Sequence, residues 1–240
     1  MTGYDNATTI FSPDGHLRQV RNASEAARKG SSVVALTGEG CIVIVSEKRL
    51  KNQLQNAATN KKIKEVNKSV VAVFAGLSAD GVALVNLVRD DAAYHLATSD
   101  VEADAKFVAE RVASTLQRYT IKGRVRPFGI IAIIAGFDFQ GIPHVYKCET
   151  HGIYSGWDAA ALGANEETIQ KYLVENYKKN QPVAECVKIG LNAASKVIDC
   201  SPDFIDVLII THDAAKKANV LKYLTPEELK AYSVSDTTST

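Results

Sequence analysis

Two spacings of apolar residues run along the chain, one typical of helices and one typical of strands. In residues 101–119, apolar side chains recur at steps of three and four, which puts one apolar seam on a single face of a helix; Ser99 or Asp100 could cap its start. Residues 128–137 are apolar without alternation, as expected of a strand that is covered on both faces. The pattern therefore predicts helices that pack on something flat and strands that lie inside the fold.

The same analysis divides the chain into groups of strands and helices. It predicts, in chain order, a hairpin at residues 31–46, a hairpin at 63–74, helices at 80–96 and 101–119 that are antiparallel neighbours, strands at 128–137, 142–147 and 152–157, helices at 166–177 and 183–199, a strand at 205–211, an edge strand near Val220 and a helix after Pro226. Two antiparallel sheets, each with a helix pair for its outer face, indicate an α+β fold of the αββα type, a four-layer sandwich. We expect residues 1–240 to form a single domain that ends in a polar tail at 233–240.

A further helix is expected ahead of the first hairpin. In residues 17–29 the apolar stripe is narrow, made of Leu17, Val20 and Ala23 and then alanines, and Gly30 is placed to end the helix. So small an apolar face is typical of a marginal surface helix whose packing depends on its neighbours.

Composition and charge narrow the class of function. Hydrophobic residues make up 46% of the chain and charged residues 23%, which is ordinary for a folded protein, and the net charge of +1 gives no global attraction for nucleic acid or anionic lipid. We therefore expect no nucleic-acid partner and no membrane partner. A lysine cluster at residues 61–68 keeps a nucleic-acid-binding module open as an alternative, which predicts steep salt-dependent binding. Residues 1–10 show no signal peptide, so we expect a protein of the cytoplasm and nucleus.

The common motifs of catalysis are absent from the sequence. It contains no phosphate-binding glycine loop, no H-E-x-x-H metal motif and no G-x-S-x-G nucleophile elbow. The four cysteines, Cys41, Cys148, Cys186 and Cys200, are scattered singly, and we expect them to be buried free thiols. We therefore expect no metal and no cofactor.

One family resemblance extends over essentially the whole chain. The N-terminus reads YDNA at residues 4–7 and IFSPDGHL at 10–17, and the resemblance continues at AGL (75–77) with AD (79–80), QRYT (117–120), RPFG (126–129) and AGFD (135–138). These segments resemble the α-type subunits of the 20S proteasome. GHL (15–17), GFDF (136–139) and YLVENY (172–177) most resemble the fourth subunit type of the eukaryotic α ring.

The resemblance implies a fold and a set of partners. The fold is that of the N-terminal-nucleophile hydrolases, whose layers agree with those predicted above. The implied role is a non-catalytic structural and gating subunit of the core particle, with no catalytic residues of its own. Its implied partners are other α subunits in a seven-membered ring, the β-ring subunits and regulatory activator particles, with the helix at residues 17–29 joining subunits.

An enzyme is the alternative. In the active β relatives the nucleophile is a threonine freed as a new N-terminus, whose own amine acts as the base. The resemblance places Ser31 at that position, with Glu47 and Lys62 near the supporting acid and lysine. An active amidase would require cleavage between Gly30 and Ser31, because a blocked amine cannot act as the base.

The resemblance also implies two non-catalytic sites. Lys62 matches the lysine that receives the C-terminal carboxylate of an activator, with Gly30 and Leu77 lining the same pocket between subunits; a solvated lysine is the alternative. Tyr4, Asp5 and Pro13 match the cluster that holds the gate of the axial pore. The sequence departs from the family at Asn6, where arginine is usual, and at Arg21-Asn22, where Glu-Tyr is usual.

Overall fold

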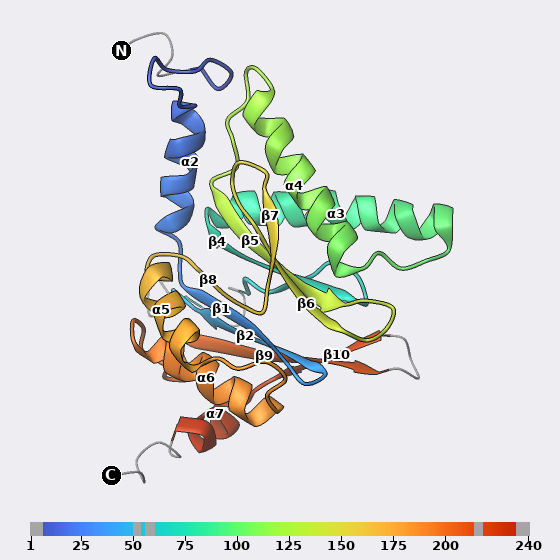
Figure 1. Cartoon of the computed structure of the whole chain (residues 1–240), viewed down its shortest axis with the longest axis vertical. Coiled ribbons are helices and arrows are strands. Elements are labelled where there is room, and N and C mark those ends of the chain that lie inside the picture. Colours follow the sequence, from blue (N-terminus) through green and yellow to red (C-terminus); the bar gives the residue numbers. More distant parts are fainter. Residues whose placement is uncertain (1–6, 50–53, 56–60, 214–217, 234–240) are drawn as a thin grey trace.

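Two antiparallel sheets stacked face to face form the centre of the computed structural model (Figure 1), which describes residues 7–49, 54–55, 61–213 and 218–233. The first sheet has the order β10 (Ala218–Tyr223), β9 (Ile205–Asp213), β2 (Cys41–Glu47), β1 (Val33–Gly38) and β8 (Ala159–Leu162). The second has the order β3 (Lys64–Glu65), β4 (Val70–Gly76), β5 (Ile130–Phe137), β6 (Pro143–Cys148) and β7 (Tyr154–Trp157).

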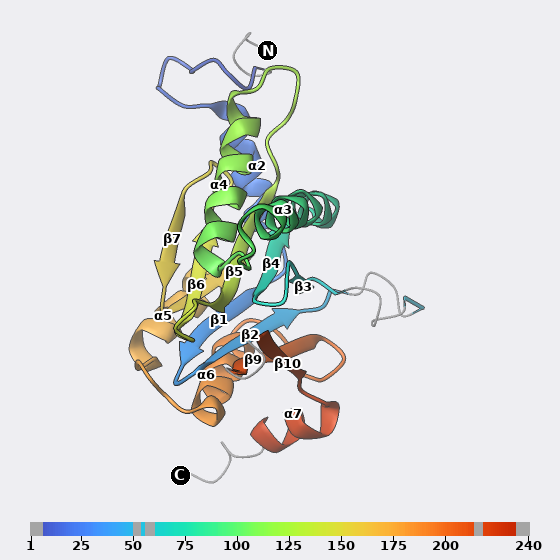
Figure 2. The same cartoon turned by 90° about the vertical axis from the view of Figure 1, so that its right-hand side faces the viewer.

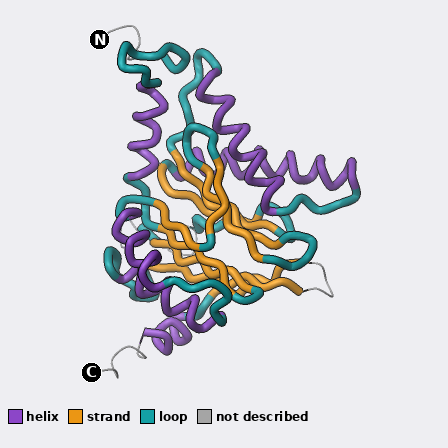
Figure 3. Tube along the Cα trace, in the orientation of Figure 1, coloured by secondary structure: helices purple, strands orange, loops and turns teal. Residues whose placement is uncertain are grey.

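Helices cover the outer face of each sheet, so that the strands form the two inner layers (Figure 3). Helices α3 (Ser78–Ser99) and α4 (Ala105–Ile121) pack on the second sheet, and α5 (Glu166–Asn176) and α6 (Val183–Ser195) pack on the first. Helix α7 (Pro226–Ser233) follows β10 and lies beside α6. The predicted four-layer αββα sandwich is confirmed.

Side-chain alternation on the strands builds three apolar layers. On β1, Val33 and Ala35 point between the sheets, whereas Val34 and Leu36 point to α5 and α6. Strand β5 contributes to two layers, because Ile131 and Ile133 face the first sheet while its neighbours in the strand face α3 and α4. Every residue of β5 is buried, which confirms a strand that is covered on both faces.

The start of α4 and its packing against α3 differ from the prediction. Asp100 ends α3 in the left-handed conformation (φ 55°), and α4 begins only after Asp104, whose Oδ1 accepts the N–H of Phe107 at 2.8 Å. A cap four residues beyond Asp100 gives α4 room to turn, so the two helices cross steeply instead of running antiparallel (Figures 1 and 2).

Strand β8 was not predicted. After β7 the chain crosses at Asp158 to the first sheet, where β8 pairs antiparallel with β1 (Val33 opposite Leu162). Its sequence, AAAL, lacks the β-branched and aromatic residues that mark strands, and the pairing comes from its neighbours in space.

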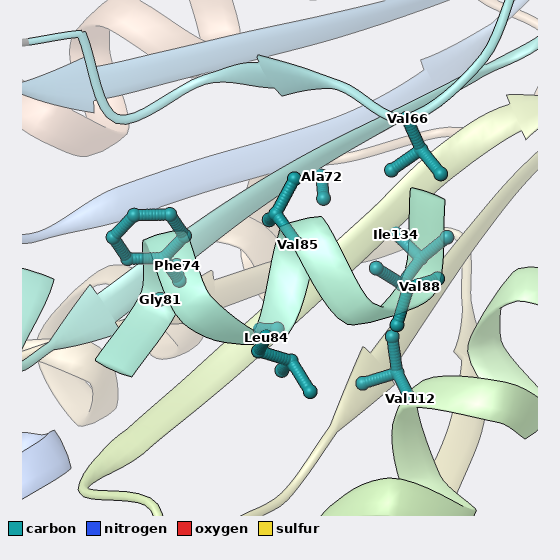
Figure 4. Close-up of a pocket in the computed structure, with 10 residues that line it drawn as sticks. Val66, Ala72, Phe74, Gly81, Leu84, Val85, Val88, Val112 and Ile134 are labelled. Atoms are coloured by element: carbon teal, nitrogen blue, oxygen red, sulfur yellow. The ribbon is translucent and has the colours of Figure 1, made fainter. Parts of the chain in front are cut away.

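A small void lies between α3 and the second sheet (Figure 4). It has a volume of about 10 Å³ and is lined by apolar side chains, among them Phe74, Leu84, Val88 and Ile134. A space of this size without polar partners stays dry, so it is a packing void and no ligand site. None of the helices in the described part of the chain combines the length and the hydropathy that are needed to cross a bilayer.

Candidate functional site

Helix α2 (Arg18–Arg28) precedes the sandwich and rises beside it toward the N-terminal end (Figure 1). Only Val20 and Ala27 are buried, and Leu17 and Ala23 are half-buried, as the narrow apolar stripe predicts. Most of the remaining surface is polar and exposed, with Arg21 and Arg28 on it. The helix therefore rests on its own domain through a narrow stripe only.

Close backbone contacts fix the end of α2 to the second sheet. A Cβ at Gly30 would lie 2.1 Å from the nitrogen of Gly76, so only glycine fits there. Gly76 has a φ of +114°, which disfavours any side chain, and a Cβ there would lie 2.2 Å from the oxygen of Gly129. The fully buried Ala27 packs above them. The chain therefore passes from α2 into the first sheet at one tightly defined point.

Ser31 follows immediately and lies inside the fold. Its residue is 2% exposed, and its Oγ has no hydrogen-bond partner among the described residues. Because Gly30 precedes it, its nitrogen is a peptide amide, and the carbonyl of Gly30 accepts the N–H of Ala164 at 3.0 Å. Ser31 thus has a buried hydroxyl and lacks the free amine that would activate it.

Glu47 binds the backbone and a neighbouring arginine. Its Oε2 accepts the N–H of Ser32 at 2.7 Å, and its Oε1 accepts Nε of Arg49 at 2.7 Å. Arg49 in turn donates from Nη1 to the carbonyl of Lys29 at 3.1 Å. The carboxylate therefore secures the junction between α2 and β1, which is a structural use of the position.

Lys62 lies near this carboxylate and is half-buried. Burial lowers the pKa of Lys62 to about 8; Glu47 opposes the change and Arg49 adds to it. Lys62 thus lies near Glu47, whose carboxylate binds the N–H of Ser32, the residue after Ser31. At pH 7 a lysine with this pKa is still mainly protonated, so it can bind an anion.

Gly30 and Leu77 lie close together through Gly76. Leu77 donates its N–H to the carbonyl of Gly129 at 3.0 Å, and its side chain is 46% exposed. Lys62 is linked to Gly30 and Leu77 less directly: it lies near Arg49, which is hydrogen-bonded to the carbonyl of Lys29.

Pro13 is exposed in a turn that the Gly15 N–H closes on the Ser12 carbonyl at 2.8 Å. Tyr4 and Asp5 lie outside the described residues.

An ion pair between Asp80, which is mostly buried, and the more exposed Arg126 was not predicted. Both oxygens of Asp80 accept from Arg126, at 2.6 and 2.7 Å, and Oδ2 also accepts the N–H of Gly129 at 2.9 Å. The hydrogen bonds from Arg126 hold the pKa of Asp80 below its usual value. The pair sets the start of β5 against α2 and Leu77. In the sequence, the two residues stood out only as members of the motifs AD (79–80) and RPFG (126–129).

The residues that the structure describes contain no group of three or more His, Cys, Asp or Glu side chains arranged to hold a metal ion. The region around the end of α2 contains the Lys62 cation near the Glu47 carboxylate, the buried hydroxyl of Ser31, and α2 itself.

Comparison with known proteins identifies the family. Residues 27–210 match the proteasome subunit family, and residues 4–26 match the N-terminal signature of the A-type proteasome subunits. The chain belongs to the proteasome subunit family. Relatives include the proteasome subunit alpha type-4 of Saccharomyces cerevisiae, 36% identical over 97% of this chain and 91% of that protein, and the alpha type-7-A subunit of Arabidopsis thaliana, 36% identical over 95% of this chain and 90% of that protein. An alpha type-7-like subunit of Macaca fascicularis is 34% identical over 95% of this chain and 90% of that protein.

These matches confirm the resemblance to α-type subunits and include a fourth-type subunit, as predicted; subunits named type-7 match at similar identity. The chain is therefore a structural subunit of the α ring of the 20S core. The signature at residues 4–26 ends just ahead of the junction at Gly30, which agrees with a non-catalytic role.

Proposed function

We propose that the chain acts as a non-catalytic scaffold and gate of a threonine-protease complex in the cytoplasm and nucleus. In this proposal residues 1–240 work as one domain, residues 1–30 supply the gate tail and the ring-forming helix, and the chain joins six other α subunits in a seven-membered ring that stacks on β-ring subunits. The observation that carries the proposal is α2, which precedes Ser31 and presents most of its surface to solvent.

The physical argument concerns how little α2 contacts its own domain. A helix of 11 residues with two buried side chains gains little stability from its own packing. A neighbouring subunit on its exposed face would add that packing. Ring formation thus explains a feature that a monomer does not need.

The test is assembly with sibling α subunits. We expect the co-produced chain to enter rings that native mass spectrometry and electron microscopy resolve as seven-membered. Arg28 and Glu25 lie on the exposed face of α2, so a variant with both changed to alanine provides a matched probe of that face. A wild-type chain that stays monomeric or dimeric with all siblings present contradicts the proposal.

We further propose that Lys62, Gly30 and Leu77 line a pocket between subunits that receives the C-terminal carboxylate of an activator. The exposed Leu77 supplies an apolar contact, and Lys62 supplies the charge. A charge-assisted hydrogen bond of this kind contributes about 1.5–3 kcal/mol, roughly tenfold to a hundredfold in affinity. Pro13, with Tyr4 and Asp5, would hold the tail that opens or blocks the pore.

Replacing Lys62 tests the pocket directly. We expect Lys62→Ala to weaken activator docking about tenfold to a hundredfold while ring assembly stays intact, because the side chain is peripheral to the core layers. Lys64→Ala, two residues away on β3, is the matched control and should leave docking unchanged. Docking should also weaken as the pH rises through about 8, where Lys62 loses its proton. Unchanged docking of Lys62→Ala in intact rings removes the assignment.

A further inference from the structure

Two cysteines far apart in the sequence meet beneath the first hairpin. Cys41 opens β2, and Cys186 lies in the first turn of α6; both are fully buried. Their sulfurs flank the same empty position: a Cβ at Gly38 would lie 2.6 Å from Sγ of Cys186 and 2.7 Å from Sγ of Cys41. The absence of a side chain at Gly38 therefore leaves the two sulfurs sharing one small space.

The hydrogen bonds of the Cys186 thiol hold it beside the first hairpin. This thiol donates weakly to the carbonyls of Gln181 at 3.6 Å and Thr37 at 3.8 Å, and Thr37 lies next to Gly38 in the hairpin that leads to Cys41. Because both sulfurs lie within 2.7 Å of one point, rotation of the two side chains can bring them toward the S–S distance of about 2.05 Å that a disulfide needs.

We propose that Cys41 and Cys186 form a redox-sensitive dithiol that hydrogen peroxide closes to a disulfide. The neighbouring thiol of Cys186 lowers the pKa of Cys41, whereas the neighbouring Cys41 and burial raise the pKa of Cys186. The two carbonyls that accept from the Cys186 thiol also keep its proton in place, so Cys41 is the thiol that reacts first and Cys186 is the one that resolves.

The reaction balances in two steps. The sulfur of Cys41, having given up its proton, attacks one peroxide oxygen; the O–O bond breaks, and the leaving hydroxide takes up a proton as water, which leaves a sulfenic acid on Cys41. The sulfur of Cys186 then attacks the sulfenic sulfur; the S–S bond forms, the S–O bond breaks, and the departing hydroxyl leaves as water with the proton of Cys186. Two thiols are oxidised and one peroxide is reduced to two waters.

The other two cysteines contact backbone carbonyls. Cys148 packs under α4, where its sulfur lies 3.7 Å from the carbonyl of Ala109, and burial raises its pKa. Cys200 lies 3.6 Å from the carbonyl of Leu191, and burial raises its pKa to about 11. We expect both to remain thiols under conditions that oxidise the pair, so the buried Cys148 and the more exposed Cys200 serve as controls.

Closing the bond would link the hairpin of the first sheet to α6. Both cysteines are fully buried, although the turn residues Glu39 and Gly40 that precede Cys41 are exposed, so a small oxidant such as hydrogen peroxide suits the pair better than a bulky thiol reagent. The cross-link spans residues 41–186 and restricts the unfolded chain, so the oxidised protein should unfold at a higher temperature.

The experiment uses the full chain, treated with hydrogen peroxide, quenched, denatured and alkylated without reduction. We expect a peptide that links Cys41 to Cys186, two alkylated cysteines in place of four, and a thermal midpoint raised on the order of 5–10 °C that reverts with dithiothreitol. Cys41→Ser and Cys186→Ser should each abolish the link and the shift, whereas Cys148→Ser and Cys200→Ser should keep both.

Three outcomes overturn the proposal. They are four alkylated cysteines after peroxide, a link that involves Cys148 or Cys200, or sulfinic acid on Cys41 without any link to Cys186. Mass spectrometry of the wild-type protein alone distinguishes all three, so the result does not depend on how well each serine variant folds.

Discussion

Single residues of the family motifs act mainly on the backbone. Asp80 and Arg126 come from two motifs that lie far apart in the sequence, and together they fix the N–H of Gly129. Gly129 in turn approaches Gly76, which leaves room for the end of α2. The motifs therefore encode the junction between the leading helix and the second sheet. Their role is structural and does not involve a nucleophile.

Asp80→Asn tests this role. The Asp80 side chain is 11% exposed and Arg126 63%, so the freed arginine regains water while the amide keeps only part of the bonding. We expect a loss of about 1–3 kcal/mol in the free energy of unfolding at pH 7, measured by urea denaturation. Because the folded pKa lies below the usual 3.8, the contribution of Asp80 is present above that value and is lost as the pH falls through the folded pKa.

The difference between wild type and Asp80→Asn should therefore shrink as the pH falls below 3.8. Asp90→Asn, at an exposed position on the same helix, is the control and should change stability little. An equal loss at pH 7 and at low pH would show that shape, and not charge, decides the effect.

Other residue properties could not be predicted from sequence. The lowered pKa of Lys62 depends on burial beside Glu47 and Arg49, and the contact between Cys41 and Cys186 depends on how α6 lies on the first sheet. Spacing along the chain carries no information on either, because both arise from packing between distant segments.

Among the helices and strands, local sequence patterns predicted an element correctly where its intrinsic propensity agrees with its packing in the fold. Helix α2 and strand β5 match their predicted spans closely, since Gly30 ends the first and a continuous apolar run makes the second. The predicted start of α4 was wrong because Ser99, Asp100 and Asp104 can all cap a helix. Which of them is used depends on how the helix packs on the second sheet. Strand β8 was missed because its alanines pair with β1 by proximity alone.

The whole molecule follows from the order of elements. Hairpins followed by a helix pair, then strands followed by a second pair, can bury every apolar face only as a four-layer stack. The same order places α2 outside the stack, at the point where residues 17–30 must either be removed or stay as a cover over Ser31. The sequence alone left both possibilities open, since an N-terminal nucleophile depends on cleavage.

Processing at Gly30 is therefore the last distinguishing measurement. We expect the purified chain to keep residues 1–30, with a mass near 25.9 kDa, and to hydrolyse no peptides, because Ser31 has a peptide amide and Glu47 is bound to Ser32 and Arg49. Ser31→Ala should then equal the wild type in ring assembly and in its lack of peptide turnover, with intact-mass spectrometry and a fluorogenic peptide assay as the two measurements. A chain that is cut to begin at Ser31 and turns over peptides unaided, with Ser31→Ala inactive, would show that the hydroxyl covered here becomes a nucleophile.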